Sequence, residues 1–440
     1  MVYWDVIHGT IDFSGEDFAN LLTDLMASPE VQRLRHMRLM NFDVPYIQDL
    51  ASAKRYPHSI GTCYLAFRLV KRSYLEPILA RSLVAAALIH DIGIPPYGHL
   101  VETMLRKRNP AFSHELLVRQ IIYGNYHPAN TYHQIQPGRS LRVAPVLADY
   151  GIDPELVLSL IAPPKGAGTA ISSGIDLDNI DNVHRMAAFL GFPDVRNNLD
   201  KLVGSVALDP DMRLVFARDA IPAIERWQEL RQIIYTQIIA HPSCVAYNAF
   251  LADMVESSID TDVIREEDWF ISDADFEAKL LASNSTRRLA LQLITGCEYV
   301  LVDYLWFRST GSPPLKEWAS FDLKLRDALG DPPLSSTQYF FWVEAKLVSR
   351  SILPLIKDVG SILFGEDSVS VLVSLVSRED LGRLNAERFK RQRSEWRRHV
   401  IKTVAEMVGD WPCSVATPEN YSDSGGFLHY VPFERQLRLF

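Results

Sequence analysis

The sequence predicts a mainly α-helical protein with a smaller α+β region at its C-terminal end. Two observations support this prediction: apolar residues recur at helical spacing up to about residue 290, and β-branched and aromatic residues concentrate after about residue 300. We therefore expect one domain over residues 1–290 and a second region over residues 291–440. A chain of 440 residues is long enough for a large core and a second domain.

The first region is expected to be a succession of apolar helices separated by short Pro/Gly breaks. Ser28-Pro29 is a helix start signal inside the first of them, because proline is favoured at the first helical position. The expected helices cover residues 21–40, 59–70, 80–90, 155–161, 176–190 and 221–240.

The second region is expected to form strands with one long helix between them. Residues 338–343 and 368–376 have strand composition, and residues 427–431 are a third candidate. A charged helix is expected over residues 378–408. Its arginines between residues 388 and 398 have acidic residues among them, which favours a solvated helix face over contact with nucleic acid.

The composition disfavours several classes of protein. The formal net charge of −9 makes a dedicated nucleic-acid binder an unfavourable interpretation. The four cysteines form no CxxC pair, which disfavours a zinc ribbon or a disulfide framework and favours a reducing cytoplasm. We expect neither a transmembrane helix nor a secretory signal, since no apolar run is long enough and the first residues lack a charged start.

The pair His90-Asp91 is the most informative feature of the chain. The apolar run of residues 85–89 ends in this imidazole and carboxylate, and Gly93 follows. Polar groups at the end of a buried helix need a partner, and a divalent metal accepts nitrogen and oxygen from adjacent residues. The sequence therefore predicts a metal site here.

Two other segments could supply the remaining ligands. His58 stands at the start of an apolar helix. Asp176, Asp178 and Asp181 lie on one turn of another, where Asp178 and Asp181 share a helix face. For Asp176 and Asp181, helix capping and pairing with arginine are the alternatives to metal contact.

The order His58, His90-Asp91, Asp178 resembles the H…HD…D pattern of HD-domain metal-dependent phosphohydrolases. Further segments resemble motifs of the dNTP triphosphohydrolase (dGTPase-like) branch of that superfamily, and together they span roughly residues 1–290. They are Asp5-Val6-Ile7-His8-Gly9, Gln32-Arg33-Leu34-Arg35, Arg55-Tyr56-Pro57-His58-Ser59, the segment His90 to His99, Ser113-His114-Glu115 and the segment Gly174 to Arg185.

The resemblance implies an HD-domain helical bundle, a nucleotide or related phosphate-ester substrate, and a homo-oligomer. It also implies a divalent metal (Mn, Mg, Fe, Zn or Ni) held by His58, His90, Asp91 and Asp178. Glu102 and His114 would form the proton-transfer pair. Substrate contacts would come from Arg55, His99, Gln32, Asn182 and Arg185, with a helix-tying role as the alternative for Gln32.

The chemistry of these residue types agrees with that assignment. A divalent metal lowers the pKa of bound water and so supplies a nucleophile at neutral pH. An arginine such as Arg55 suits bidentate contact with phosphate, and a histidine held by a carboxylate can protonate a leaving oxygen near pH 7.

Several positions depart from the family pattern, three of them within the motifs given above. Ile94 replaces a histidine, Asn182 replaces a tyrosine, and Met186 replaces an aspartate expected to contact the sugar. The metal residues are present while the nucleoside-reading ones are altered, so phosphate-ester hydrolysis is a firmer prediction than the substrate.

Three alternatives remain open at this point. The chain could be a non-catalytic nucleotide-binding regulatory or interaction protein that keeps the metal site. It could be an HD-type phosphatase or phosphodiesterase acting on another ester. It could also be a two-iron oxygenase of the HD fold, with His99 and His114 as the extra ligands.

Overall fold

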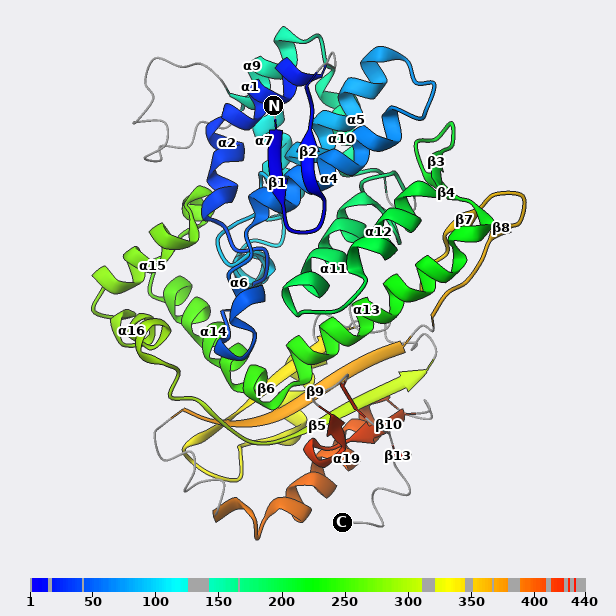
Figure 1. Ribbon diagram of the computed structural model, residues 1–440. Coiled ribbons are helices and arrows are strands. Elements are labelled where there is room, and N and C mark those ends of the chain that lie inside the picture. The colour runs from blue at the N-terminus through cyan, green and yellow to red at the C-terminus, as the bar shows by residue number, and fades with distance from the viewer. Residues whose placement is uncertain are drawn as a thin grey trace. The chain divides into compact units, whose positions relative to one another are not determined.

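The computed structural model confirms a mainly α fold with a smaller α+β region (Figure 1). The structure describes residues 2–14, 18–41, 43–125, 142–164, 167–310, 321–344, 351–365, 368–378, 388–408, 413–422, 426–427 and 431–432.

The chain divides into two compact units. The first comprises Met1–Leu230, Met254–Leu291 and Ile352–Leu363, and the second comprises Arg231–Asp253, Gln292–Ser351 and Phe364–Phe440. The first unit therefore includes residues 352–363, which lie beyond residue 290, and the second unit includes residues 231–253, which lie before it. The single domain boundary expected near residue 290 stays a prediction.

Helices make up most of the first unit. They are α1 (Ala19–Ala27), α2 (Pro29–Arg33), α3 (Gln48–Ala51), α4 (Arg55–Val70), α5 (Pro77–Ile89), α6 (His99–Arg108), α7 (His114–Ile122), α9 (Val143–Asp149), α10 (Pro154–Ile161), α11 (Leu177–Phe189), α12 (Val195–Gly204), α15 (Asp273–Ala282) and α16 (Arg287–Thr295, which runs into the second unit). Helices α13 (Ile221–Ala240) and α14 (Pro242–Asp260) each contribute to both units.

The helix start predicted at Ser28-Pro29 is confirmed, but the helical segment that was expected to run to residue 40 ends earlier, which corrects the prediction. Ser28 caps α2 by accepting a hydrogen bond from Val31 N, and Pro29 opens that helix. After a short 3₁₀ turn the backbone leaves the helical path, because Leu39 N donates to the carbonyl oxygen of Ala53 instead of to a helical partner.

Helix α4 begins at Arg55, four residues before the predicted start. Pro57 fits in its first turn, where the backbone N–H has no helical partner. As a result, His58 is a helical residue, and its side chain points from a rigid element.

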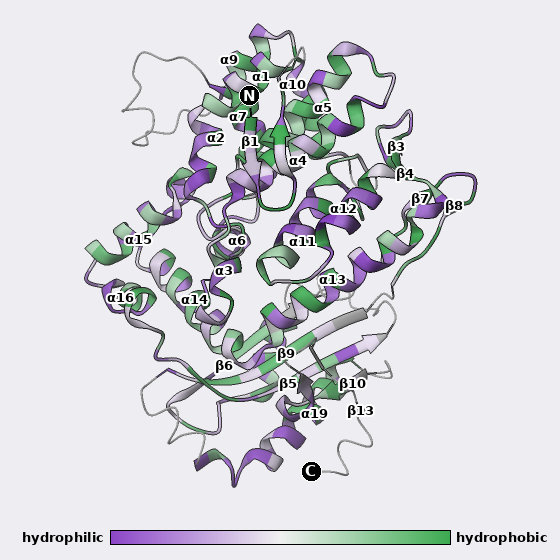
Figure 2. Ribbon diagram, viewed as in Figure 1, coloured by the Kyte–Doolittle hydropathy of each residue, from purple (hydrophilic) through white to green (hydrophobic). Residues whose placement is uncertain are grey.

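Helix α5 lies among the most apolar elements of the unit (Figure 2), and its residues 83–89 are completely buried. Helix α4 packs against both α5 and α11. These three helices form the part of the core beside the predicted metal ligands.

Short strands complete the first unit, and the prediction of mostly helices up to about residue 290 did not include the four that lie there. Strands β1 (Val2–Asp5) and β2 (Gly9–Asp12) form an antiparallel hairpin joined by residues 6–8. A second sheet has the order β3-β4-β7-β8, from Val206–Leu208, Leu214–Phe216, Leu355–Ile356 and Gly360–Ser361.

The second unit contains a five-stranded antiparallel sheet in the order β13-β10-β5-β9-β6. Its strands are β5 (Val300–Thr310), β6 (Thr337–Glu344), β9 (Ser368–Ser377), β10 (Cys413–Ala416) and β13 (Val431–Pro432). Strands β11 (Tyr421–Ser422) and β12 (Gly426–Phe427) pair separately.

Helix α19 (Arg393–Val408) packs on one face of this sheet, and α17 (Phe321–Leu329) joins the same apolar cluster (Figure 1). The predicted strands at residues 338–343 and 368–376 are confirmed, whereas β5 was not predicted. The third candidate is two short strands, β12 and β13, with residues 428–430 outside the described part.

The long charged helix expected over residues 378–408 is interrupted: residues 388–389 are helical, residues 390–392 form a turn, and α19 begins at Arg393, while residues 379–387 lie outside the described part. Its expected solvated face is wrong at one position. Arg397 is only 4% exposed, because its guanidinium is held by the buried carboxylate of Asp303.

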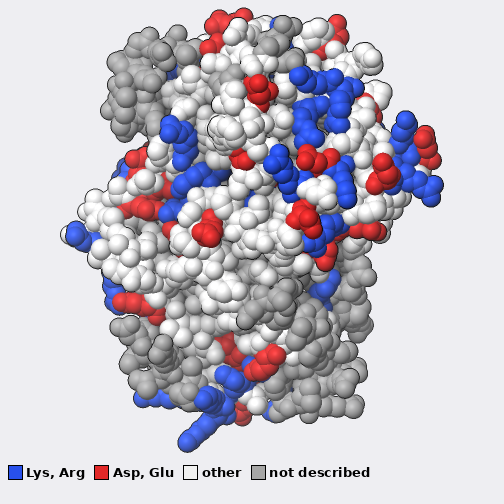
Figure 3. Space-filling view, viewed as in Figure 1, with Lys and Arg blue, Asp and Glu red and all other residues white. Residues whose placement is uncertain are grey.

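On the face shown in Figure 3, basic and acidic side chains are interspersed. Within the described residues, no single helix is long and apolar enough to cross a membrane. The consecutive helical segments Arg218–Ile238 and Pro242–Asp260 meet the length and composition test together, but they are bent by 68°, and buried core helices pass the same test.

Candidate metal centre and its proton-transfer group

Three helix ends of the first unit bring His58, His90 and Asp178 together. His58 lies in the first turn of α4, His90 caps the C-terminus of α5, and Asp178 lies in the first turn of α11. One ligand atom from each residue lies within 4.8 Å of the others. His58 Nε2 is 2.9 Å and His90 Nε2 is 3.6 Å from Asp178 Oδ1.

The donor atoms fit a divalent metal. His90 Nδ1 donates to the carbonyl oxygen of Ala87 (2.9 Å), so in the neutral ring Nε2 carries the lone pair. This Nε2 is buried and has no hydrogen-bond partner among the described residues. A buried polar atom without a partner is costly, and a cation at this point would provide one. Two imidazole nitrogens and a carboxylate oxygen form a common ligand set for a transition metal.

Asp91 lies at the edge of this group. Its Oδ2 is 3.8 Å from His90 Nε2 and accepts a 2.7 Å ion pair from Arg55 Nη1. Burial opposes ionisation, but Arg55 and His90 outweigh it and hold the pKa of Asp91 below its usual range. The carboxylate is therefore ionised at neutral pH, as a metal ligand must be.

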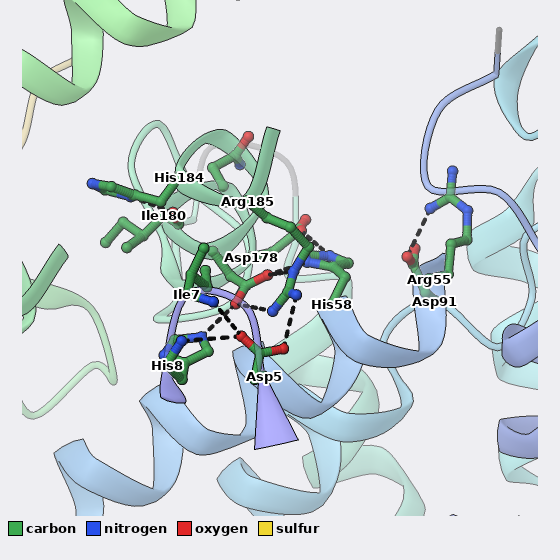
Figure 4. Close-up of polar contacts among 12 residues, drawn as sticks. Asp5, Ile7, His8, Arg55, His58, Asp91, Asp178, Ile180, His184 and Arg185 are labelled. Atoms are coloured by element: carbon green, nitrogen blue, oxygen red, sulfur yellow. Dashed lines mark hydrogen bonds and ion pairs between the residues drawn. The ribbon is translucent and has the colours of Figure 1, made fainter. Parts of the chain in front are cut away.

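A second set of buried polar contacts lies on the Nδ1 side of the His58 ring (Figure 4). Asp181, on the same helix as Asp178, accepts from His58 Nδ1 (2.8 Å), His8 Nε2 (2.7 Å) and Arg185 Nε (2.9 Å). Arg185 Nη1 also pairs with Asp5 Oδ2 at 2.8 Å. We call these five residues, Asp5, His8, His58, Asp181 and Arg185, the Asp181 cluster.

Carboxylates on both sides determine the protonation of His58. Burial alone would lower its pKa, but the hydrogen bonds to Asp178 and Asp181 outweigh that effect and raise the pKa of His58 to about 9. Arg185 and the two histidines likewise overcome burial and hold the pKa of Asp181 well below its usual range. A cation bound at Nε2 of His58 would replace a proton there while Nδ1 keeps its own.

Helix capping and pairing with arginine were the alternatives to metal contact for Asp176 and Asp181, and local contacts match these alternatives. Asp176 is the N-cap of α11 and accepts from Asn179 N at 2.7 Å. Asp181 pairs with Arg185, an arginine four residues later on the same helix.

The predicted proton-transfer residues form a group of their own. Glu102 is 3% exposed; its Oε2 lies 2.8 Å from His99 Nδ1, and both of its oxygens lie 3.1 Å from His114 Nδ1. Burial opposes the change, but Glu102 raises the pKa of His114, and the two histidines lower the pKa of Glu102. The structure therefore places His99, one of the predicted substrate contacts, with the Glu102–His114 pair.

The other predicted substrate contacts lie in different settings. Gln32 donates to the carbonyl oxygen of Met26 and accepts from Arg35, and it lines a cavity of about 460 Å³. The Oδ1 atom of Asn182 is buried without a hydrogen-bond partner among the described residues. The guanidinium of Arg185 is 1% exposed and already engaged within the Asp181 cluster.

Ile94, which replaces the expected histidine, is buried, and its backbone is used structurally. Its carbonyl oxygen accepts from Arg33 Nη2 at 2.6 Å. Sequence reasoning gave no role to His8 or Asp5, although both lie in a segment that resembles a family motif. That motif was the only signal that could have drawn attention to them.

Comparison with known proteins gives partial support to the resemblance found in the sequence. No family model matches the chain. It is 26% identical over 228 residues to the uncharacterized protein YwfO of Bacillus subtilis, which is 50% of this chain and 48% of YwfO. It is 22% identical over 223 residues to the uncharacterized protein MJ1154 of Methanocaldococcus jannaschii, covering 50% and 42%. The chain thus spans about half the length of the curated relatives it matches.

A shorter match is to a protein of stated activity. The chain is 35% identical over 105 residues to deoxynucleoside triphosphate triphosphohydrolase SAMHD1 of Bos taurus, which is 22% of this chain and 17% of that protein. These similarities support the HD superfamily in a broad sense and do not distinguish its dGTPase-like branch.

Proposed function

We propose that this chain is a divalent-metal-dependent phosphohydrolase that acts on nucleotides, with deoxynucleoside triphosphates as the first substrates to test. The observation that carries the proposal is the unpartnered, buried His90 Nε2, which faces His58 and Asp178. The partial similarity to deoxynucleoside triphosphate triphosphohydrolases supports the choice of substrate class.

His58, His90, Asp91 and Asp178 would hold the metal. When bound, the metal supplies an acidified water and offsets charge on the phosphoryl oxygens. Arg55, held by Asp91 through Nη1, would contact a phosphate oxygen through a second guanidinium nitrogen.

His114 is proposed as the general acid. Glu102 fixes its Nδ1 and raises its pKa, which favours the protonated ring, with Nε2 as the donor to a leaving oxygen. Asn182 would contribute its unpartnered Oδ1 as a hydrogen-bond acceptor for substrate. Contacts from His99, Gln32 and Arg185 complete the proposed set.

The first experiment is a substrate screen on protein stripped with a chelator and reloaded with Mn²⁺ or Mg²⁺. We expect release of nucleoside and triphosphate, or of phosphate, from at least one nucleotide. Asp178→Asn should reduce both metal content and activity to the metal-free level, whereas Asp200→Asn, an exposed aspartate paired with Arg68, should change neither. A metal-loaded wild type that hydrolyses no nucleotide would contradict the proposal.

A second experiment separates proton transfer from metal binding. His114→Gln should lower kcat by about 10²–10⁴-fold while leaving the bound metal in place. Glu102→Gln removes the carboxylate that raises the pKa of His114, so the high-pH limb of the kcat profile should move to lower pH. Unchanged profiles in both variants would remove His114 from the proposal.

The non-catalytic alternative is favoured by Ile94 and Met186, both buried apolar residues where the family pattern has polar ones. Nucleotide binding without turnover in the metal-loaded wild type would support it. Elemental analysis of the same sample tests the oxygenase alternative, which requires two irons per chain.

We propose four further properties of the chain. They are a phosphohydrolase domain within residues 1–290, action in the cytoplasm, assembly as a homo-oligomer, and phosphate esters other than nucleotides as a second substrate class.

A further inference from the structure

The hairpin turn at residues 5–9 reaches the proposed metal site through two buried side chains. Asp5 Oδ1 accepts from the backbone N–H groups of Ile7 and His8, which fixes the turn. The turn then contacts Asp181 directly through His8, and Arg185 links Asp5 Oδ2 to the same carboxylate. Asp181 in turn accepts from His58.

We propose that Asp181 and His8 are positioning residues for the metal ligand His58, and that the residue 5–9 turn is part of the support of the metal site. This inference rests on the proposed function, because it requires a metal at His58, His90 and Asp178. Neither Asp181 nor His8 is proposed to touch the metal.

The role of Asp181 follows from the chemistry of a carboxylate. An ionised carboxylate only accepts hydrogen bonds, so the His58 nitrogen that faces it, Nδ1, must carry a proton. This fixes the tautomer that leaves Nε2 for the metal, and it also fixes the plane of the ring. Without Asp181, the imidazole could present the wrong nitrogen or rotate away.

His8 and Arg185 hold Asp181 in this orientation. His8 bonds Oδ2, Arg185 bonds both oxygens, and His58 takes the remaining position on Oδ1. The Asp181 carboxylate has no exposed surface, so water does not compete for it.

Stability alone does not account for His8. Its side chain is 1% exposed, and its Nδ1 has no hydrogen-bond partner among the described residues. A buried nitrogen without a partner costs free energy that an apolar side chain of similar size would avoid. A role in holding Asp181 explains why an imidazole stands there.

Gly61 provides the space for this arrangement. A Cβ atom at Gly61 would overlap Asp181 Oδ2 and approach Arg185 Nη2 to 2.6 Å. The backbone of α4 therefore lies directly against the carboxylate, one turn from His58 on the same helix.

The test uses the full chain, stripped of metal, and measures the Kd for Mn²⁺ by titration calorimetry together with the Tm of the metal-free protein. Asp181→Asn should weaken Mn²⁺ binding by about 10–100-fold, the usual effect of losing such a partner of a ligand. His8→Leu should weaken it by a smaller factor. His8→Gln, whose Nε2 can still donate to Asp181, should bind more tightly than His8→Leu.

Asp12→Asn is the matched control, because Asp12 lies in the same hairpin but its carboxylate bonds only Ser14. It should leave the Kd unchanged. A merely structural role would lower the Tm of the metal-free variants and leave the Kd of the folded protein at the wild-type value.

The outcomes separate the two proposals. A wild type that binds no Mn²⁺ overturns the proposed function. A wild type that binds, with Asp181→Asn and His8→Leu folded and equally tight, overturns only this inference. If Asp181→Asn does not fold, the order of affinities of His8→Gln and His8→Leu decides: equal values overturn the inference, and tighter binding by His8→Gln supports it.

Discussion

Each unit of the molecule buries a carboxylate against an arginine, and the two pairs differ in how they are completed. In the second unit, Arg397 donates to both oxygens of Asp303 at 2.7 Å and to Glu419. In the first unit, Asp181 and Arg185 are joined by Asp5 and by two imidazoles, His8 and His58.

The difference lies in the unsatisfied atoms around each pair. Beside the Asp181 cluster, His8 Nδ1 and His90 Nε2 are buried without partners among the described residues. In the second pair, the Asp303 oxygens are shared between Arg397 and the Tyr304 backbone N–H, and a buried atom beside it without a hydrogen bond is Arg393 Nε, 3.6 Å from Asp303 Oδ2. A guanidinium nitrogen can only donate, whereas an imidazole nitrogen can carry a lone pair, so the free atoms beside the Asp181 cluster are the ones suited to a cation.

The largest expected effect on stability comes from breaking the Asp303–Arg397 pair. Asp303→Ala removes the buried carboxylate of the pair, leaves Arg397 with only the half-exposed Glu419 as a charge partner among the described residues, and should cost about 3–5 kcal/mol in the free energy of unfolding. Urea denaturation of the purified variant measures this loss. The double variant Asp303→Leu/Arg397→Met should recover most of it, and a single variant within about 1 kcal/mol of wild type would contradict the comparison.

The next largest effect on stability comes from adding a methyl group against the Asp181 cluster. Gly61→Ala forces a methyl group against Asp181 and should cost about 3 kcal/mol, the upper range for overpacking. It should also weaken Mn²⁺ binding, which Asp303→Ala should not. Gly204→Ala is the control, since a Cβ there meets nothing within 4 Å, and it should leave both quantities nearly unchanged.

A buried histidine without a carboxylate partner should respond to acid. His184 bonds the carbonyl oxygen of Ile180 and the side chain of Asn198, and burial lowers its pKa to about 4. Because this folded-state pKa lies below the unfolded value of about 6.5, its contribution to stability is present above pH 6.5 and is lost as the pH falls towards 4.

Between pH 7 and pH 5, this loss should be on the order of 2 kcal/mol. The measurement is the pH dependence of the unfolding free energy of wild type against His184→Gln, which cannot take up the proton. Parallel curves for the two proteins would show that His184 does not titrate in this way.

The smallest expected effect belongs to an exposed pair. Arg68 Nη1 and Asp200 Oδ1 are 2.9 Å apart, with half of the aspartate side chain exposed to solvent. Arg68→Ala should change the unfolding free energy by less than about 1 kcal/mol, and the change should shrink in high salt. A loss as large as that of Asp303→Ala would mean that burial does not set the ranking.

The sequence predicted the helical class and the convergence of His58, His90 and Asp178, because each residue stands at a helix end within a recognisable motif. It could not predict that Asp181 binds His8, since these residues are separated by 173 positions and no periodicity connects them. The requirement for glycine at position 61 likewise depends on where α11 lies against α4.

Strand β5 escaped prediction for a related reason. Its sequence, VLVDYLWFRST, places Asp303 and Arg308 among apolar residues, and Asp303 is compatible with a buried strand only because Arg397 lies opposite. The irregular pairing between Leu301 and Asp303 further disturbs the alternation of side chains that identifies a strand.

The distance along the chain between His8 and Asp181 has a consequence for synthesis. At about 5–20 residues per second, a ribosome adds the intervening 173 residues in about 9–35 s. The N-terminal hairpin and His58 are made before that interval ends, and the carboxylate that holds them is made last. A nascent chain that ends before Asp181 therefore carries the histidines without their common anchor, and the site can close only after α11 has left the ribosome.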